Sequence, residues 1–165
     1  MATIYPFQAV MPPAEKVADV ASPPYDVMSG PEARLMVQGK PLSLLHVTRS
    51  EVDLPAEIDV YSDQVYERAR QNYHKLCADV PLNRDAIPNL YVYRLIMNGH
   101  QQTGIAACAS VDEYENNVIK KHEKTRRAKE DDRTRHIVRV GAQTGPVFLT
   151  YRDQPRIDEM IASVT

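Results

Sequence analysis

Short apolar runs separated by pairs of prolines open the chain, a pattern that predicts brief extended segments joined by rigid turns. Residues 4–10 are expected to form a short strand that ends at residues 11–13. Residues 16–21 are predicted as a second extended segment. Residues 22–26 follow, with the sequence Ser22-Pro23-Pro24-Tyr25-Asp26. Because proline fixes φ and restricts the residue before it, this stretch predicts a rigid turn.

Helical signals come next, around one apolar segment. Ser29 or Gly30 is expected to cap a short helix with Pro31 in its first turn, and this helix should end at residues 39–41. Residues 42–48 are mostly apolar, as expected for a buried strand. After a polar loop, residues 61–78 predict a helix with one apolar stripe, made by Val65, Ala69, Tyr73 and Leu76 beside Tyr66.

The second half contains the clearest hairpin signal of the chain. Residues 90–97 are rich in strand-forming types, Asn98-Gly99 is a strong turn signal, and residues 103–110 return. Asp112 is expected to cap a short helix through Val118. The remaining pattern predicts one helix over residues 119–140, a strand over 146–151 and a last helix over 156–164.

Helices and strands that interleave without a regular repeat, together with one antiparallel hairpin, predict an α+β fold. We expect a mixed sheet with flanking helices. The length of 165 residues fits one domain or part of a larger one. Because the last helical pattern reaches Thr165 without a closing cap, residues 1–165 are expected to be a single, truncated region of a larger domain.

Composition narrows the class of protein. No apolar run approaches the roughly 20 residues that cross a bilayer, and the first residues lack the pattern of a signal peptide. Cys77 and Cys108 stand alone, without the spacing of a zinc or redox site. We therefore expect a cytoplasmic protein with no membrane contact.

Charge is unevenly distributed along the chain. The formal net charge is −2, but nine of the 20 Lys and Arg residues lie between Lys120 and Arg139, against four acidic residues. A net charge near zero argues against a general nucleic-acid-binding protein. The local surplus of positive charge favours contact with one anionic ligand. A solvent-exposed helix laced with ion pairs is the alternative.

Residues 119–140, taken as one helix, bring the candidate site residues onto two adjacent stripes. Each side chain type suits a role toward a phosphorylated ligand. Arginine and lysine bind phosphate oxygens, carboxylates serve as a general base or hold Mg²⁺, and histidine transfers protons near neutral pH. The candidates are Arg126, Lys129 and Arg133 for phosphate, Thr125 for a hydroxyl contact, His122 and Glu123 for catalysis, and Glu123 with Asp132 for a metal.

Ion pairs within this segment are the competing interpretation, for example Glu123 with Arg126 or Arg127, and Glu130 with Arg133. Sharper motifs are absent from the sequence. Arg126 stands where a zincin helix needs its second histidine, and there is no Walker A loop, GxGxxG or GxSxG motif. Tyr25 and Asp26, in the proline-stiffened turn, are expected to form one wall of the ligand site.

A series of short motifs occurs in order along almost the whole chain. It consists of Pro6-Phe7, Ser22-Pro23-Pro24-Tyr25-Asp26-Val27, Ser43-Leu44-Leu45-His46-Val47, Leu90-Tyr91-Val92-Tyr93, Thr103-Gly104-Ile105, His122-Glu123-x-Thr125, Lys129-Glu130-x-Asp132-Arg133 and Gly145-Pro146-Val147-Phe148-Leu149-x-Tyr151. This series resembles the bacterial and archaeal domain-of-unknown-function family 1015 (DUF-1015). The charged motifs are the most specific part of the resemblance.

The resemblance implies that this chain is an N-terminal portion. Members of that family are usually more than twice as long, and their second half carries an Asp-Gly-His-His-Arg motif similar to that of the ParB/sulfiredoxin-like fold, which includes free-serine kinases. No such motif occurs here. The missing C-terminal half is accordingly an expected partner of the site.

Three functions remain open on the sequence. The first is nucleotide-dependent phosphoryl transfer to a small hydroxyl metabolite such as serine, with ATP or ADP and Mg²⁺ as cofactors and this chain supplying part of the site. The second is a non-catalytic binding or regulatory module for a nucleotide or anionic metabolite. The third is nucleic-acid binding, which the acidic residues within the basic segment disfavour.

Overall fold

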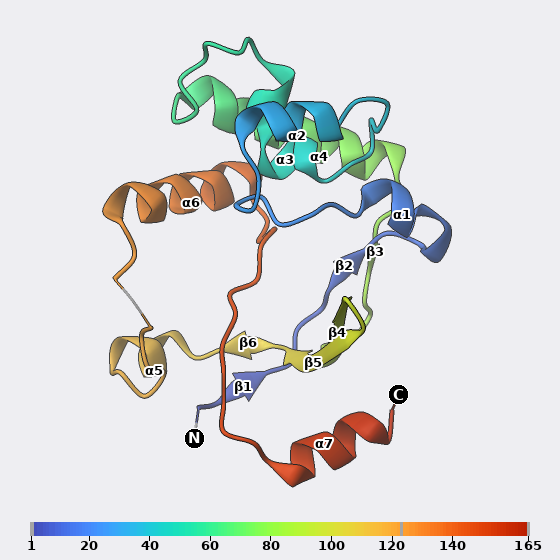
Figure 1. Cartoon of the computed structure of the whole chain (residues 1–165), viewed down its shortest axis with the longest axis vertical. Coiled ribbons are helices and arrows are strands. Elements are labelled where there is room, and N and C mark those ends of the chain that lie inside the picture. Colours follow the sequence, from blue (N-terminus) through green and yellow to red (C-terminus); the bar gives the residue numbers. More distant parts are fainter. Residues whose placement is uncertain (1, 123, 165) are drawn as a thin grey trace. The chain divides into compact units, whose positions relative to one another are not determined.

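The computed structural model describes residues 2–122 and 124–164 and divides into two compact units (Figure 1). Unit 1 comprises Met1–Ala9, Arg84–His122 and Val147–Thr165. Unit 2 comprises Val10–Asn83 and Glu123–Pro146. The segment between residues 118 and 151, which carries the candidate site, is therefore distributed over both units.

Unit 2 is mostly helical. Its elements are β2 (Val10–Met11), η1 (Ala14–Lys16), α1 (Val17–Val20), α2 (Gly30–Met36), α3 (Leu45–Thr48), η2 (Ser50–Asp53), α4 (Asp63–Asp79) and α6 (Arg127–Val140). β2 pairs with β3 (Asn83–Arg84), where the chain passes from one unit to the other.

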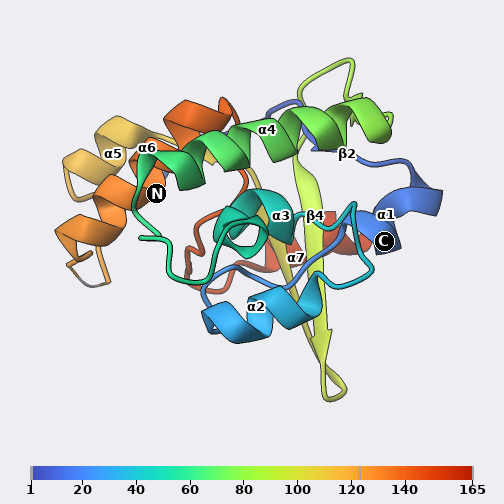
Figure 2. The ribbon, with the colours of Figure 1, turned by 90° about the horizontal axis from the view of Figure 1, so that it is seen from above.

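The core of unit 2 forms along α4, which contacts both α3 and α6 (Figure 2). The predicted stripe supplies the buried Val65, Tyr66, Ala69 and Leu76. A cluster of buried apolar side chains joins α4 to the other helices and consists of Val20, Val47, Ala69, Leu76, Val80 and Val140. Gly141, in the left-handed conformation with φ of 75°, ends α6 where glycine is favoured.

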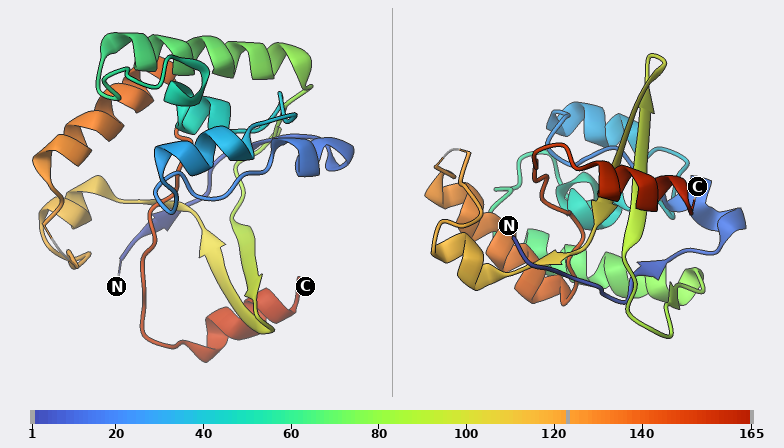
Figure 3. Two further views of the ribbon diagram at one scale, coloured as in Figure 1. Left: turned by 45° about the horizontal axis from the view of Figure 1, so that its top comes forward. Right: turned by 90° about the horizontal axis from the view of Figure 1, so that it is seen from below.

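Unit 1 is built on strands. Its elements are β1 (Ile4–Tyr5), β4 (Tyr91–Met97), β5 (His100–Ala106), β6 (Cys108–Ala109), α5 (Val111–Glu115) and α7 (Pro155–Ala162). β1 pairs antiparallel with β6, and β4 with β5 in the long hairpin visible in Figure 3. At its tip Asn98 and Gly99 both have positive φ, 52° and 79°, as a two-residue hairpin turn requires.

Several predictions are confirmed. The fold is α+β, with strands that pair two by two in the described residues. The hairpin, α4 and α7 lie close to the predicted ranges. Ser29 is the N-cap of α2 and forms a capping box with Glu32, whose carboxyl pKa is lowered by hydrogen bonds from the Ser29 hydroxyl and backbone N–H.

Two predicted strands in the first half are helices instead. Residues 16–21 include α1, and residues 42–48 include α3. The second segment is buried as predicted, but a short apolar run does not distinguish a buried strand from a buried helical turn. In α3, Thr48 and Arg49 donate backbone hydrogen bonds to Leu44 and Leu45, four residues earlier.

The prediction of one helix over residues 119–140 is wrong in its first part. Val118 and Ile119 both donate to the carbonyl of Glu113, and Asn117 takes a left-handed φ of 59°, so the chain turns after α5. α6 begins only at Arg127. The cap of α5 is Ser110, whose hydroxyl accepts from Glu113 N–H, and not Asp112.

The predicted strand over residues 146–151 is also wrong, because these residues lie in no strand. Val147 and Phe148 are 79% and 76% exposed. A strand needs a hydrogen-bonding neighbour, and strand-forming residue types alone do not supply one.

The sequence predicts no membrane-spanning segment. No helix in residues 2–122 or 124–164 is long and apolar enough to span a bilayer.

Candidate functional site

Helix α6 carries most of the basic segment, and its basic side chains fall into two groups. One group is ion-paired along the helix or to α4: Arg135 with Asp63 at 2.7 Å, Arg139 with Glu67 at 3.6 Å, and Arg127 with Asp131 at 4.0 Å. These pairs support the ion-pair interpretation for that group. Of the pairs predicted, those of Glu123 lie outside the described residues, and Arg133 pairs with Asp132 instead of Glu130. The pairs of Arg135 and Arg139 also join α6 to α4.

The second group forms one face of α6, which we call the basic face and define as Arg126, Lys129 and Arg133. Three- and four-residue spacing places these side chains in a row. Two of them lie over aromatic rings: Lys129 Nζ is 5.7 Å from the centre of the Tyr61 ring, and Arg133 Cζ is 4.3 Å from that of Tyr25. Cations at such distances are attracted to the ring faces.

Arg133 is held from two sides. Its Nε and Nη2 donate to Oδ2 of Asp132 at 3.0 and 2.8 Å, and its Cζ lies over the ring of Tyr25. The side chains of Arg133 and Asp132 are only 29% and 11% exposed. Among the described residues, Nη1 of Arg133 has no hydrogen-bond acceptor. A half-buried guanidinium thus keeps one donor edge for a ligand.

Asp132 is itself held by α4. The Tyr66 hydroxyl donates to its Oδ1 at 2.8 Å. Burial, followed by this hydrogen bond to the carboxylate, raises the pKa of Tyr66 to about 12, so its proton stays in place at physiological pH. Arg135 lies over the ring of Tyr66, with its Cζ 4.3 Å from the ring centre. The chain of contacts from Tyr66 through Asp132 fixes the position of Arg133.

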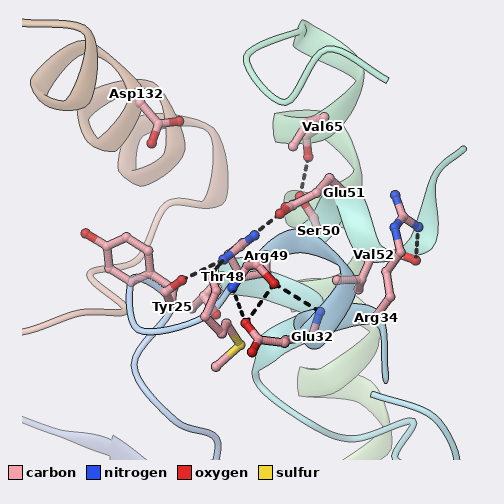
Figure 4. Close-up of polar contacts among 12 residues, drawn as sticks. Tyr25, Glu32, Arg34, Thr48, Arg49, Ser50, Glu51, Val52, Val65 and Asp132 are labelled. Atoms are coloured by element: carbon pink, nitrogen blue, oxygen red, sulfur yellow. Dashed lines mark hydrogen bonds and ion pairs between the residues drawn. The ribbon is translucent and has the colours of Figure 1, made fainter. Parts of the chain in front are cut away.

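The loop that presents Tyr25 is held by Arg49 (Figure 4). Nη1 of Arg49 donates to the carbonyl oxygens of Tyr25 and Met28 at 2.8 and 2.9 Å. Nε of the same side chain donates to Oε1 of Glu51 at 2.6 Å, in a pair whose side chains are 17% and 10% exposed. The prolines stiffen this loop, and Arg49 ties it to the segment between α3 and η2.

His136 of α6 contacts α3 through a hydrogen bond. Its Nε2 lies 2.9 Å from the carbonyl oxygen of Val47, so this nitrogen carries the proton, and the residue is 3% exposed. Desolvation lowers the pKa of His136; the Val47 carbonyl opposes this shift, and Arg133 adds to it. A buried neutral imidazole in this place is a packing residue that orients the helix.

The structure brings together three of the predicted site residues, Tyr25, Asp132 and Arg133. Lys129 and Arg126 share their helix face and are exposed, and Arg126 is the N-cap of α6. Thr125 precedes the helix and Asp26 follows Tyr25, and both are exposed.

The two predicted catalytic residues are His122 and Glu123, of which the structure describes only His122. His122 is exposed and belongs to unit 1. Glu123 lies outside the described residues, so its roles as base and metal ligand stay predictions. In residues 2–122 and 124–164, no group of three or more His, Cys, Asp or Glu side chains is placed to hold a metal ion. The carboxylate of Asp132 is engaged by Tyr66 and Arg133.

Sequence reasoning missed Arg49, Glu51 and Tyr66 as parts of this arrangement. Arg49 and Glu51 fell in a stretch predicted as a polar loop, yet Glu51 is 8% exposed. The available signal in the sequence was a pair of oppositely charged residues, Arg49 and Glu51, directly after an apolar run. Tyr66 was assigned to helix packing, which is correct for its ring but omits the hydroxyl.

Comparison with known proteins gives one result. Over residues 4–165 the chain matches the model of a family described as "Protein of unknown function (DUF1015)". No curated protein and no solved structure matches the chain. The resemblance drawn from the motifs is confirmed, whereas the further likeness to ParB-like proteins and free-serine kinases stays a prediction.

Proposed function

The chain belongs to the DUF1015 family, which is described as of unknown function, and we propose that it binds a small phosphate-bearing ligand, such as a nucleotide, on the basic face of α6. The observation that carries this proposal is the state of Arg133. Its guanidinium is ordered by Asp132 and Tyr25 before any ligand arrives, and Nη1 has no acceptor among the described residues. Arginine in a fixed orientation suits the planar, bidentate recognition of phosphate oxygens.

The start of α6 supports the same proposal. Its N-cap residue, Arg126, makes no side-chain cap hydrogen bond. The first N–H groups of a helix have no partner within it, and the helix dipole places partial positive charge there. Arg126 and Lys129 add further positive charge at this end. A bound anion would satisfy the N–H groups and offset the repulsion among these cations.

Along α6, Arg126 and Arg133 are seven residues apart, which corresponds to about 10 Å of helix at 1.5 Å per residue. Lys129 lies between them. A ligand with two or more phosphoryl groups, such as ADP, ATP or pyrophosphate, can therefore span the row. A binding or regulatory role without turnover is the function that the described geometry supports best.

Phosphoryl transfer to a small hydroxyl metabolite such as serine is the catalytic form of this proposal. It requires Glu123 as base or ligand for Mg²⁺, and the C-terminal half that the family resemblance implies. Asp132 does not serve as the base, because its carboxylate is engaged by Tyr66 and Arg133. We therefore expect the isolated chain to bind nucleotide without turning it over.

The test is calorimetric titration of the 165-residue chain with pyrophosphate, ADP and ATP. Arg133→Met should weaken binding by roughly tenfold or more, which corresponds to about 1.4 kcal/mol. Arg127→Met is the matched control, because it removes the same charge from the same helix at a side chain that is 94% exposed. It should change affinity less than about twofold.

Equal losses in the two variants would mean that the ligand senses only the general charge of α6. Absence of binding by all three ligands at millimolar concentration would refute the proposal. Nucleic-acid binding is distinguished by measuring affinity for DNA at several salt concentrations. Neutralisation of many phosphates along a polymer makes that affinity fall steeply as salt rises.

A further inference from the structure

A second place in unit 2 has the features of a ligand site, and it shares no residue with the basic face of α6. It is a cavity of about 310 Å³ between the segment preceding α3, α3 itself, η2 and α4. Its apolar lining includes Leu42, Val47 and Leu76. This volume lies near the lower end of the range of roughly 300–1,000 Å³ that is usual for small-molecule sites.

One wall of the cavity is a closed hydrogen-bond network. Nδ1 of His46 lies 2.9 Å from both carboxylate oxygens of Asp53, and its Nε2 lies 3.2 Å from the carbonyl oxygen of Lys40. Asn72 Nδ2 donates to the carbonyl oxygen of His46 at 2.6 Å and to Asp53 at 2.8 Å. The network joins α3, η2 and α4, so this wall is ordered without a ligand.

The charge of the cavity is not balanced. Asp53 is its one lining carboxylate, and His46 and Asn72 already occupy both of its oxygens. Arg68, four residues before Asn72 on the same helix, lines the cavity and is partly buried. Within the described part of the chain, Arg68 has neither an ion-pair partner nor a hydrogen-bond acceptor. Removing a cation partly from water without a partner is unfavourable unless something else compensates.

Lys75 adds a second positive charge on the same helix face, at spacing i+7 from Arg68. Unlike Arg68 it has a partner, the exposed Asp79. The buried Ser43 completes the polar lining. A ligand would therefore find one unpaired guanidinium, an ordered polar wall and an apolar floor.

We propose that this cavity binds a small organic acid, with its carboxylate on Arg68 and its hydrocarbon part on Leu42, Val47 and Leu76. The guanidinium fork matches the geometry of a carboxylate, which it binds through two parallel hydrogen bonds. The apolar floor adds affinity in proportion to the hydrocarbon surface that it removes from water. Neither an inorganic anion nor a neutral alcohol satisfies both halves of the site.

The experiment is an NMR titration of the 165-residue chain, labelled at the methyl groups of leucine and valine, with hexanoate, hexanol and inorganic phosphate. Hexanoate should shift the methyl resonances of Leu42, Val47 and Leu76 saturably, and hexanol should bind at least roughly fivefold more weakly. Arg68→Gln should weaken hexanoate binding by about tenfold. Arg70→Gln is the matched control, because Arg70 is two residues away, 46% exposed and paired with Glu67.

Three outcomes would overturn the proposal: equal binding of hexanoate and hexanol, binding of phosphate at least as tight as that of hexanoate, or no saturable shift up to about 50 mM hexanoate. Equal losses in Arg68→Gln and Arg70→Gln would also contradict it. If Arg68→Gln does not fold, as judged by circular dichroism, the ligand series and the set of shifted methyl groups in the unmodified chain decide the question.

Discussion

The two compact units of this protein differ in how much apolar surface they bury. Unit 2 contains the largest fully buried side chains, Leu45, Val47 and Val80. In the described part of unit 1, Ile119 at 9% exposure is the one hydrophobic residue counted as buried, while Ile96 and Met97 of the hairpin are 68% and 74% exposed. Apolar content alone therefore does not indicate where the core lies.

The candidate site follows the same division. Arg133, Asp132, Tyr66 and Arg49 belong to unit 2, where packed helices restrict the side chains that bear charge. The hairpin of unit 1 depends on turn geometry and strand pairing, which operate without a core. A site that must hold an arginine in one orientation needs the first kind of surroundings.

The largest difference between the units is expected for core truncation. Leu45→Ala, at a residue that is 1% exposed, should destabilise the protein by about 2–5 kcal/mol because it removes buried methyl groups and leaves a cavity. Leu95→Ala, at 51% exposure in β4, should cost less than about 1 kcal/mol. Urea denaturation followed by circular dichroism measures both. Similar losses would abolish the contrast between the units.

The partly buried ion pair under the Tyr25 loop gives the next effect. Arg49→Met leaves Glu51 without its partner and the carbonyl oxygens of Tyr25 and Met28 without a donor. We expect a loss of about 2–3 kcal/mol in urea denaturation, below the value for a fully buried pair because both side chains retain some exposure. The variant should also weaken pyrophosphate binding, since Tyr25 is no longer held against Arg133. Unchanged pyrophosphate affinity would show that the Tyr25 loop does not contribute to the site.

Removal of the Tyr66 hydroxyl should have a smaller effect. Tyr66→Phe is expected to cost about 1 kcal/mol, because the ring still packs and Asp132 retains Arg133. The pKa of Tyr66 is raised in the folded protein, so its contribution is complete below pH 10 and is lost as pH rises from 10 toward 12. Urea midpoints between pH 8 and 12 should therefore fall more steeply for the unmodified chain than for Tyr66→Phe. Parallel curves would contradict the assigned hydrogen bond.

The smallest predicted effect concerns His136. Burial lowers its pKa in the folded state, so protonation favours the unfolded chain, and stability is lost as pH falls below the ordinary histidine value of about 6.5. His136→Asn keeps a donor toward the Val47 carbonyl but does not titrate. The difference between the two urea midpoints should change between pH 7 and 5. A constant difference would show that His136 does not resist protonation.

Local signals in the sequence predicted the elements whose geometry is local. Asn98-Gly99 defined the hairpin, Ser29 with Glu32 defined the start of α2, and the apolar stripe defined α4. Residues 42–48 were predicted as a strand because a short apolar run suits either kind of buried backbone. Which kind forms depends on tertiary contacts, such as the hydrogen bond from Leu44 N–H to the Val20 carbonyl.

For the candidate site, the sequence indicated residue types but not which side chains contact one another. Arg133, Asp132 and Tyr25 were identified from a charged motif and a stiff turn, but Tyr66 lies 66 positions before Asp132 in the chain. Pairing over such a separation leaves no periodic signature. The same holds for Arg135 and Asp63, whose ion pair joins α6 to α4.

The central claim is that Arg133, although paired with Asp132, keeps its Nη1 for phosphate, whereas Arg135 and Arg139 are paired with carboxylates of α4. NMR observation of the arginine Nε–H groups during a pyrophosphate titration tests it most directly, with Arg135 and Arg139 as internal controls. The account predicts a saturable shift of the Arg133 resonance, while those of Arg135 and Arg139 move little. Equal, unsaturated movement of all three resonances would contradict it, because it would show only the general response of a basic helix to an anion.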